Sequence, residues 1–169
     1  DIYAGYVAKK MGLPINKLII ATNDNDILKR VISSGIYKPL KVKHTISPSM
    51  DIQVASNFER LIFDVCSHDS NRILKLMNDL EKQGEFKLQK DELKKIKESF
   101  FSESLSEDET KSTIKDIYKN QGMLIDPHTA VAIGVVNKIS LEGNTIILAT
   151  AHPSKFSETV MQETGVKPE

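Results

Sequence analysis

Polar residues follow two apolar runs of the sequence at the point where each run ends. The run 17–22 leads into Asn23, and the run 145–149 leads into Thr150 and His152. Both runs are short, aliphatic and bounded by turn residues, which predicts buried strands. Ligands of open parallel sheets bind beyond the carboxyl ends of the strands. These two ends are therefore candidate binding sites, although Asn23 could instead cap a helix and Thr150 could instead only form a turn.

Four other residues could do chemistry, each with a structural alternative. His152 could act as a general base, but a structural hydrogen bond in its turn is favoured. His128 lies just inside an expected helix N-terminus and could bind an anion or simply pack there. Arg60 could pair bidentately with a phosphate or carboxylate, or form an ion pair within its helix. Cys66 lies on an apolar stripe near Val65, so we expect a buried, unreactive thiol.

Motifs for other chemistries are missing from the sequence. His44 and His68 have no partners at metal-ligand spacing, so we expect no metal site. There is no Walker loop, dinucleotide fingerprint, nucleophile elbow or Cys-x-x-Cys pair. Spacing alone therefore indicates a ligand-binding sheet edge and no specific reaction.

Helices and strands alternate in the first part of the chain. A helix is expected up to Gly12, followed by the strand 17–22 and a helix that ends at Gly35. A further helix is expected with Phe58, Leu61, Ile62 and Val65 on one face. This order is typical of an α/β protein, here a three-layer arrangement with a parallel sheet flanked by helices.

The last part of the chain returns to this pattern. Asp126-Pro127 is a strong helix start, with Gly134 expected to allow a close approach of another element. The strand 145–149 follows, and Ser157 is expected to cap a final helix. Between the two α/β parts, residues 67–121 are rich in charges of both signs, and a capping box starts a helix at Ser106.

The predicted organisation has three parts. Residues 1–66 and 122–169 are expected to be segments of one large α/β domain, and 67–121 a charged helical excursion at its edge. The chain has 169 residues with 23 Lys+Arg and 23 Asp+Glu, and this neutral balance argues against nucleic-acid and anionic-membrane partners. A single cysteine excludes a disulfide framework and favours a reducing, cytoplasmic setting.

Four blocks of the sequence, in order, carry a family resemblance. They are KLIIATNDND (17–26), SPSMDIQVASNFER (47–60), DPHTAVA (126–132) and LATAHPSKF (148–156). Together they resemble threonine synthase, a pyridoxal 5'-phosphate (PLP) enzyme of the tryptophan-synthase-β group. The resemblance covers essentially the whole chain, is weakest in residues 67–121, and implies part of a fold-type-II PLP domain.

The resemblance implies a lyase of threonine biosynthesis that converts O-phospho-L-homoserine and water to L-threonine and phosphate. Thr150 would then hydrogen-bond the pyridine nitrogen of PLP, and Asn23 would line the cofactor pocket. Other members of the resembling blocks receive no role: Ser47, Ser49, Arg60, Asp126 and His152.

The chain departs from the family pattern at its beginning. The sequence starts at Asp1 within a helix that resembles the one after the family's glycine-rich phosphate loop, and no lysine stands in the context of the Schiff-base lysine. We therefore expect a carboxyl-terminal fragment that needs the amino-terminal part of the enzyme. Two alternatives remain open: another PLP-dependent lyase or dehydratase of this fold group, and a non-catalytic domain with residues 67–121 as its interaction surface.

Overall fold

The computed structural model describes residues 2–139, 141 and 143–169, so the possible helix cap at Asp1 lies outside the described residues. The chain divides into two compact units. The first comprises the residues up to Ile20 together with Asp26–Val42 and Ile52–Glu103. The second comprises Ala21–Asn25, Lys43–Asp51 and Ser104–Glu169. The predicted division at residues 66 and 121 stays a prediction.

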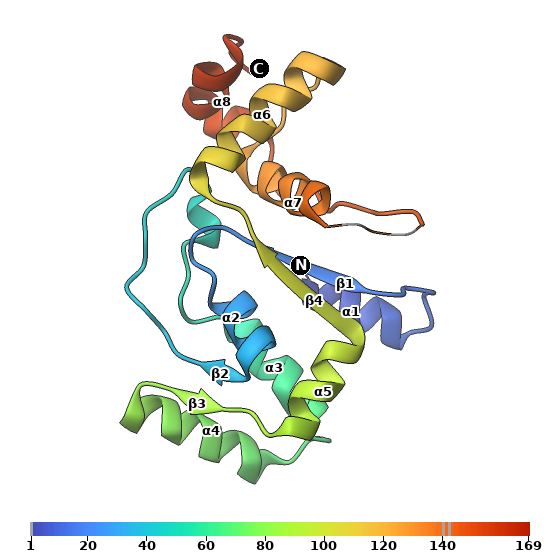
Figure 1. Ribbon diagram of the computed structural model, residues 1–169, viewed down its shortest axis with the longest axis vertical. Helices are drawn as coiled ribbons and strands as arrows, with labels where there is room; N and C mark the ends of the chain where they lie inside the picture. The colour runs from blue at the N-terminus through green and yellow to red at the C-terminus, as the bar shows by residue number, and fades with distance from the viewer. Residues whose placement is uncertain (1, 140, 142) are drawn as a thin grey trace. The chain divides into compact units, whose positions relative to one another are not determined.

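The helices of the first unit are α1 (Ile2–Lys10), α2 (Ile27–Ser34), α3 (Ser56–Val65), α4 (Ser70–Gln83) and α5 (Lys90–Ser99) (Figure 1). Two short strands, β2 (Ile36–Tyr37) and β3 (Phe86–Lys87), pair in antiparallel orientation. The ring of Tyr37 stacks on Phe58 at 5.5 Å and on Phe86 at 4.7 Å between ring centroids. The predicted α3 face is confirmed, since its four apolar residues are all buried.

Strands β1 (Leu18–Thr22) and β4 (Phe100–Ser104) form the second pair. The hydroxyl of Ser102 donates to the Ile20 carbonyl at 2.9 Å, and the Leu105 N–H donates to the Thr22 carbonyl at 2.9 Å. Because residue numbers rise together on both strands, the pair is parallel, which confirms the predicted α/β class. Only alternate residues of β1 are fully buried, so β1 is not buried on both faces as a continuous apolar run would indicate.

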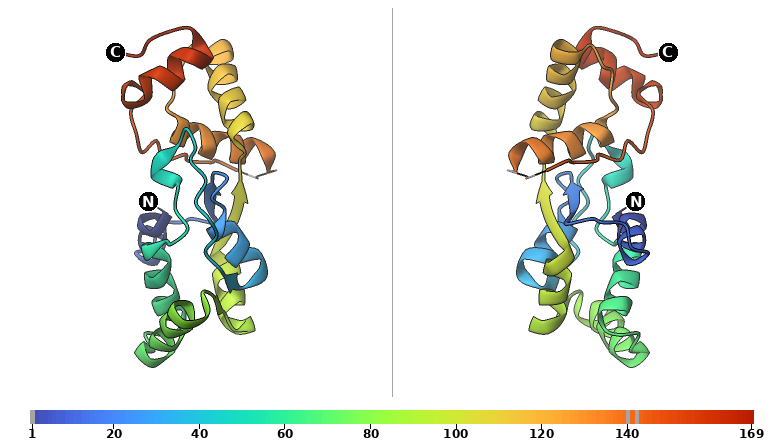
Figure 2. Two further views of the ribbon diagram at one scale, coloured as in Figure 1. Left: turned by 90° about the vertical axis from the view of Figure 1, so that its left-hand side faces the viewer. Right: turned by 90° about the vertical axis from the view of Figure 1, so that its right-hand side faces the viewer.

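The second unit is built on α6 (Glu107–Gln121), α7 (Pro127–Lys138) and α8 (Ser157–Thr164), with 3-10 turns η1 (Pro48–Met50) and η2 (Pro153–Phe156). Helix α6 contacts both α7 and α8 (Figure 2). Both predicted helix starts are confirmed: Ser106 and Glu109 form a capping box, and Asp126 caps α7. A Cβ atom added to Gly134 would lie 2.9 Å from Thr113 Oγ1 and closer still to Leu105, which confirms the expected close approach.

Three expectations about elements are wrong. Residues 145–149 form no strand, and the residues Ile146 and Leu148 are 86% and 53% exposed. A strand exists only with a hydrogen-bonded neighbour, and no described residue pairs with this segment. Strand β4 was not expected within the charged region 67–121. The last helix is preceded by η2 and Ser157 is its first residue, not its cap.

Within the described residues, no helix combines the length and hydropathy needed to cross a membrane.

Candidate functional site

Asn23, directly after β1, is the centre of a buried polar network in the second unit. Its side chain is almost fully buried, with the residue 3% exposed. The amide nitrogen lies 2.9 Å from Thr45 Oγ1, 3.0 Å from Ser47 Oγ and 2.8 Å from Asp51 Oδ1. The amide oxygen accepts the backbone N–H of Asn25 at 2.9 Å. Asn23 therefore ties the loop 43–51 to the end of the strand, which is neither of the two roles considered from the sequence.

Asn25 and Asp51 complete this network. The Asn25 side chain donates to the Lys43 carbonyl at 2.9 Å and to Asp51 Oδ1 at 3.0 Å, and it accepts the Lys43 N–H at 2.9 Å. Asp51 also accepts the N–H and the hydroxyl of Thr45 at 2.9 and 2.7 Å. Since the loop contains only the three-residue turn η1, these side chains determine its conformation.

A second buried cluster lies where the same loop meets the start of α7. The Ser49 backbone N–H donates to His128 Nε2 at 3.2 Å, so the ring carries its proton on Nδ1. His128 Nδ1 then donates to Asp126 Oδ1 at 2.9 Å. The His128 ring also packs at 57° against Phe156, 4.7 Å between centroids.

Asp126 is fully buried and accepts hydrogen bonds on both carboxylate oxygens. Burial alone would raise the pKa of Asp126, but hydrogen bonds from the side chains and backbone N–H groups of His128 and Thr129 lower it. The backbone N–H groups of His128 and Thr129 at the start of α7 both donate to Asp126. They are therefore not free to bind an approaching anion. Anion binding by His128 is not supported by this geometry.

The second predicted strand end is arranged differently. Thr150 is exposed, and its hydroxyl makes no hydrogen bond to a described residue. His152 Nδ1 lies 3.3 Å from the Ser154 N–H and 2.8 Å from the Ser154 hydroxyl, which is the structural bond favoured from the sequence. The structure thus places Asn23 and Ser47 in the first buried cluster and Asp126 in the second, and both clusters contact loop 43–51. Thr150 belongs to neither cluster. The cofactor contacts of Thr150 and Asn23 stay predictions.

The hydroxyl of Thr22, at the end of β1, is a further feature that the sequence did not single out. It is buried and has no hydrogen-bond partner among the described residues. An unsatisfied buried hydroxyl is uncommon in folded proteins and marks a place where a ligand or water is expected. Its position supports the carboxyl end of β1 as the side of the sheet that meets a ligand.

Arg60 and Cys66 belong to the first unit and take no part in these clusters. Arg60 is exposed on α3 and forms no ion pair with a described residue, so the ion pair considered within its helix is not present, whereas its pairing with a phosphate or carboxylate stays a prediction. Cys66 is half-buried and donates to Glu92 Oε1 at 3.4 Å. Burial, together with the Glu92 carboxylate, raises the pKa of the thiol to about 11, so it stays protonated and unreactive.

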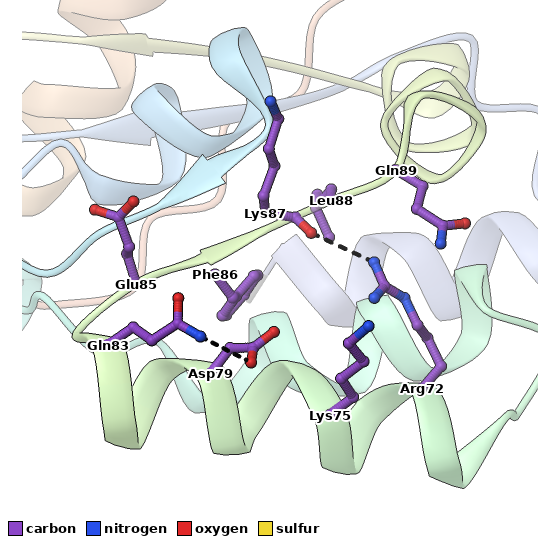
Figure 3. Close-up of a pocket in the computed structure, with 9 residues that line it drawn as sticks. All are labelled: Arg72, Lys75, Asp79, Gln83, Glu85, Phe86, Lys87, Leu88 and Gln89. Atoms are coloured by element: carbon purple, nitrogen blue, oxygen red, sulfur yellow. Dashed lines mark hydrogen bonds between the residues drawn. The ribbon is translucent and has the colours of Figure 1, made fainter.

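An open groove of about 310 Å³ lies on the first unit (Figure 3). Arg72 and Lys75 project from α4 beside β3, and Arg72 donates to the Lys87 carbonyl at 3.3 Å. Arg72 also holds the Glu92 carboxylate through two bonds of 2.7 and 2.9 Å. None of the residues predicted as site residues lines this groove, and its charged side chains of both signs resemble a solvated surface.

Several residues of the two clusters had no predicted role, namely Asn25, Thr45, Asp51 and Thr129. The paired polar residues Asn23 and Asn25 after an apolar strand were the available signal. Their partners on loop 43–51 are 18 to 28 positions away, and no spacing rule connects them. Fold and clusters together define an α/β protein with a polar site at the carboxyl end of a parallel strand.

Comparison with known proteins gives a narrower assignment. Residues 129–169 match the family model described as threonine synthase, C-terminal. The chain is 40% identical to threonine synthase of Pseudomonas aeruginosa over 95% of its length, and 41% identical to that of Saccharomyces cerevisiae, also over 95%. The structure of PLP-bound threonine synthase from Brucella melitensis covers all of the chain with a TM-score of 0.96 and 46% identity.

Over nearly its whole length, the chain is similar to threonine synthases. It spans about a third of the length of these relatives, with 34% and 35% of the two sequences and 37% of the Brucella chain covered. The resemblance seen in the four sequence blocks is thereby confirmed, as is the α/β fold of this PLP-enzyme group.

Proposed function

We propose that the protein to which this chain belongs is a PLP-dependent lyase that converts O-phospho-L-homoserine and water to L-threonine and phosphate. The observation that carries the proposal is identity of about 40% over nearly the whole chain to threonine synthases of organisms as distant as Pseudomonas and yeast. When bound, PLP supplies the electron sink of the reaction, and the protein supplies binding and orientation. The single, unreactive cysteine agrees with a cytoplasmic setting.

The segment that ends at Thr150 fits this cofactor. Ile146 and Leu148 are largely exposed, and such an apolar segment needs cover from another element. Thr150 follows them with a hydroxyl that has no partner among the described residues. We propose that the remaining part of the enzyme covers residues 145–149, and that Thr150 then donates to the PLP ring nitrogen. A neutral hydroxyl partner would leave that nitrogen largely unprotonated.

The chain alone is proposed to be catalytically incomplete. No lysine here stands in the context of the family's Schiff-base lysine, so the amino-terminal part has to provide it. We expect the full-length protein to release phosphate and form threonine from O-phospho-L-homoserine, and the isolated chain to do neither. A stoichiometric visible band on adding PLP to the isolated chain, traced to one lysine, would contradict this. Preference of the full-length protein for another amino-acid substrate would instead support a dehydratase or a different lyase.

The role of Thr150 gives a separate prediction. In the full-length protein, Thr150→Val should weaken PLP binding about tenfold, because valine has a shape similar to threonine but offers the ring nitrogen no hydrogen bond. Thr150→Ser keeps the hydroxyl and should bind PLP within about twofold of the original protein. Titration of the apoenzyme with PLP measures both. Equal affinity of the Val variant would remove Thr150 from the cofactor site.

A further inference from the structure

Both ring nitrogens of His128 are used in fixed directions. Nδ1 donates to the buried carboxylate of Asp126 at 2.9 Å, and Nε2 accepts the Ser49 N–H at 3.2 Å. His128 is 7% exposed and Asp126 is 0% exposed, so water competes little with either bond. The carboxylate sets the tautomer of the ring, and the tautomer makes Nε2 an acceptor for the loop.

The Ser49 bond holds one end of a loop whose other contacts lie at the end of β1. Loop 43–51 has no regular structure besides η1, and Thr45, Ser47 and Asp51 all bond to Asn23. The Ile46 N–H adds a bond to Glu107 Oε2 at 3.2 Å. Ser49 itself is exposed, and its hydroxyl has no partner among the described residues. The turn therefore presents a free hydroxyl from a backbone that His128 fixes.

We propose that Asp126 and His128 form a positioning pair that sets the conformation of loop 43–51 for the bound substrate. The inference rests on the proposed function, because the loop meets the strand end where a ligand of this fold is expected. Neither residue has to touch the substrate. Asp126 orients the imidazole, the imidazole holds the backbone of Ser49, and the loop holds its polar side chains at the strand end.

The test uses three variants of the full-length holoenzyme. His128→Leu keeps most of the volume but offers Ser49 no acceptor, whereas the amide oxygen of His128→Gln can take the place of Nε2. Val135→Ala is the stability control, because Val135 is fully buried on the same helix and makes none of these polar contacts. Unfolding temperature, cofactor affinity, kcat and KM for O-phospho-L-homoserine are measured for each.

We expect His128→Leu to lower kcat by about tenfold to a hundredfold, since small displacements of positioning groups have effects of this size. His128→Gln should stay within about threefold of the original kcat, and Val135→Ala within about twofold despite its lower unfolding temperature. A His128→Leu enzyme with the kcat of Val135→Ala, or a Gln variant as slow as Leu, would overturn the proposal. Should the Leu variant not fold, His128→Asn, whose amide is too short to reach Ser49, replaces it.

Hydrogen exchange of loop 43–51 keeps this test separate from the proposed function. Without the acceptor, the Ser49 amide should exchange about tenfold faster in His128→Leu and at an unchanged rate in His128→Gln. If the original enzyme makes no threonine, the proposed function fails while the exchange experiment still reports on the loop. Unchanged exchange in His128→Leu would overturn the positioning role whatever the substrate is.

Discussion

Replacing Arg72 by Met is expected to lower the free energy of unfolding by about 3–5 kcal/mol, because it leaves a buried carboxylate without its cation. The Glu92 side chain is 7% exposed and that of Arg72 is 15% exposed, so solvent screens their two-bond contact only weakly. Glu92 also accepts the Gln89 N–H at 2.7 Å, which closes the capping box at the start of α5. Urea denaturation followed by circular dichroism measures the loss.

Two controls separate this effect from a general change on α4. Lys75→Met removes an exposed cation one turn along the helix, and it should change the free energy of unfolding by less than about 0.5 kcal/mol. Combining Arg72→Met with Glu92→Leu removes both charges and should restore much of the loss. If the double variant is no more stable than Arg72→Met alone, the buried charge is not the cause.

The Arg72 effect also has a predicted pH dependence. Burial alone would raise the pKa of Glu92, but the bonds from Arg72, the Gln89 backbone and Cys66 lower it. A carboxyl group whose pKa is lower in the folded than in the unfolded state stabilises the fold at pH values above its unfolded-state pKa. This stabilisation is lost as the pH falls through the folded-state pKa. In Arg72→Met burial should dominate and raise the pKa of Glu92. The difference in stability between the two proteins should therefore narrow from pH 7 toward about pH 4.

Helix ends were predictable from the sequence because their causes are local. The capping box at Ser106 and the Asp126-Pro127 start depend on residues within four positions of each other, and both are present. Strand pairing was less predictable. Strand β4 lies about 80 residues after its partner β1, and its alternating burial is hidden in a highly charged region. The apolar run 145–149 has strand composition, but composition alone does not supply a neighbouring strand.

The candidate site was predicted only in part for a similar reason. The sequence located the strand end at Asn23, and the family resemblance drew attention to Ser47, Ser49 and Asp126. That these residues share two clusters on one loop depends on contacts over 24 to 79 positions. The order of residues along the chain does not indicate such contacts. A structure was therefore needed to see that Asn23 holds the loop through Ser47 and that His128 holds it through Ser49.

Asn23→Leu is the second substitution for which we expect a large effect, a loss of about 3 kcal/mol or more in the free energy of unfolding. Leucine has a similar shape but leaves the buried polar atoms of Ser47 and Asn25 short of a partner, and each such group costs about 1–3 kcal/mol. Urea denaturation gives the loss. Asn57→Leu, an exposed position on α3, is the matched control and should change stability by less than about 0.5 kcal/mol.

The same variant tests whether Asn23 acts through the loop or through the cofactor. If it acts through the loop, Asn23→Leu should speed amide exchange throughout residues 43–51, because the network that fixes this segment loses its centre. The affinity of the full-length apoenzyme for PLP should then fall only to the extent that the loss of order in loop 43–51 accounts for. Strong loss of PLP affinity with normal exchange in the loop would instead support a direct contact between Asn23 and the cofactor, and the loop-holding role would have to be abandoned.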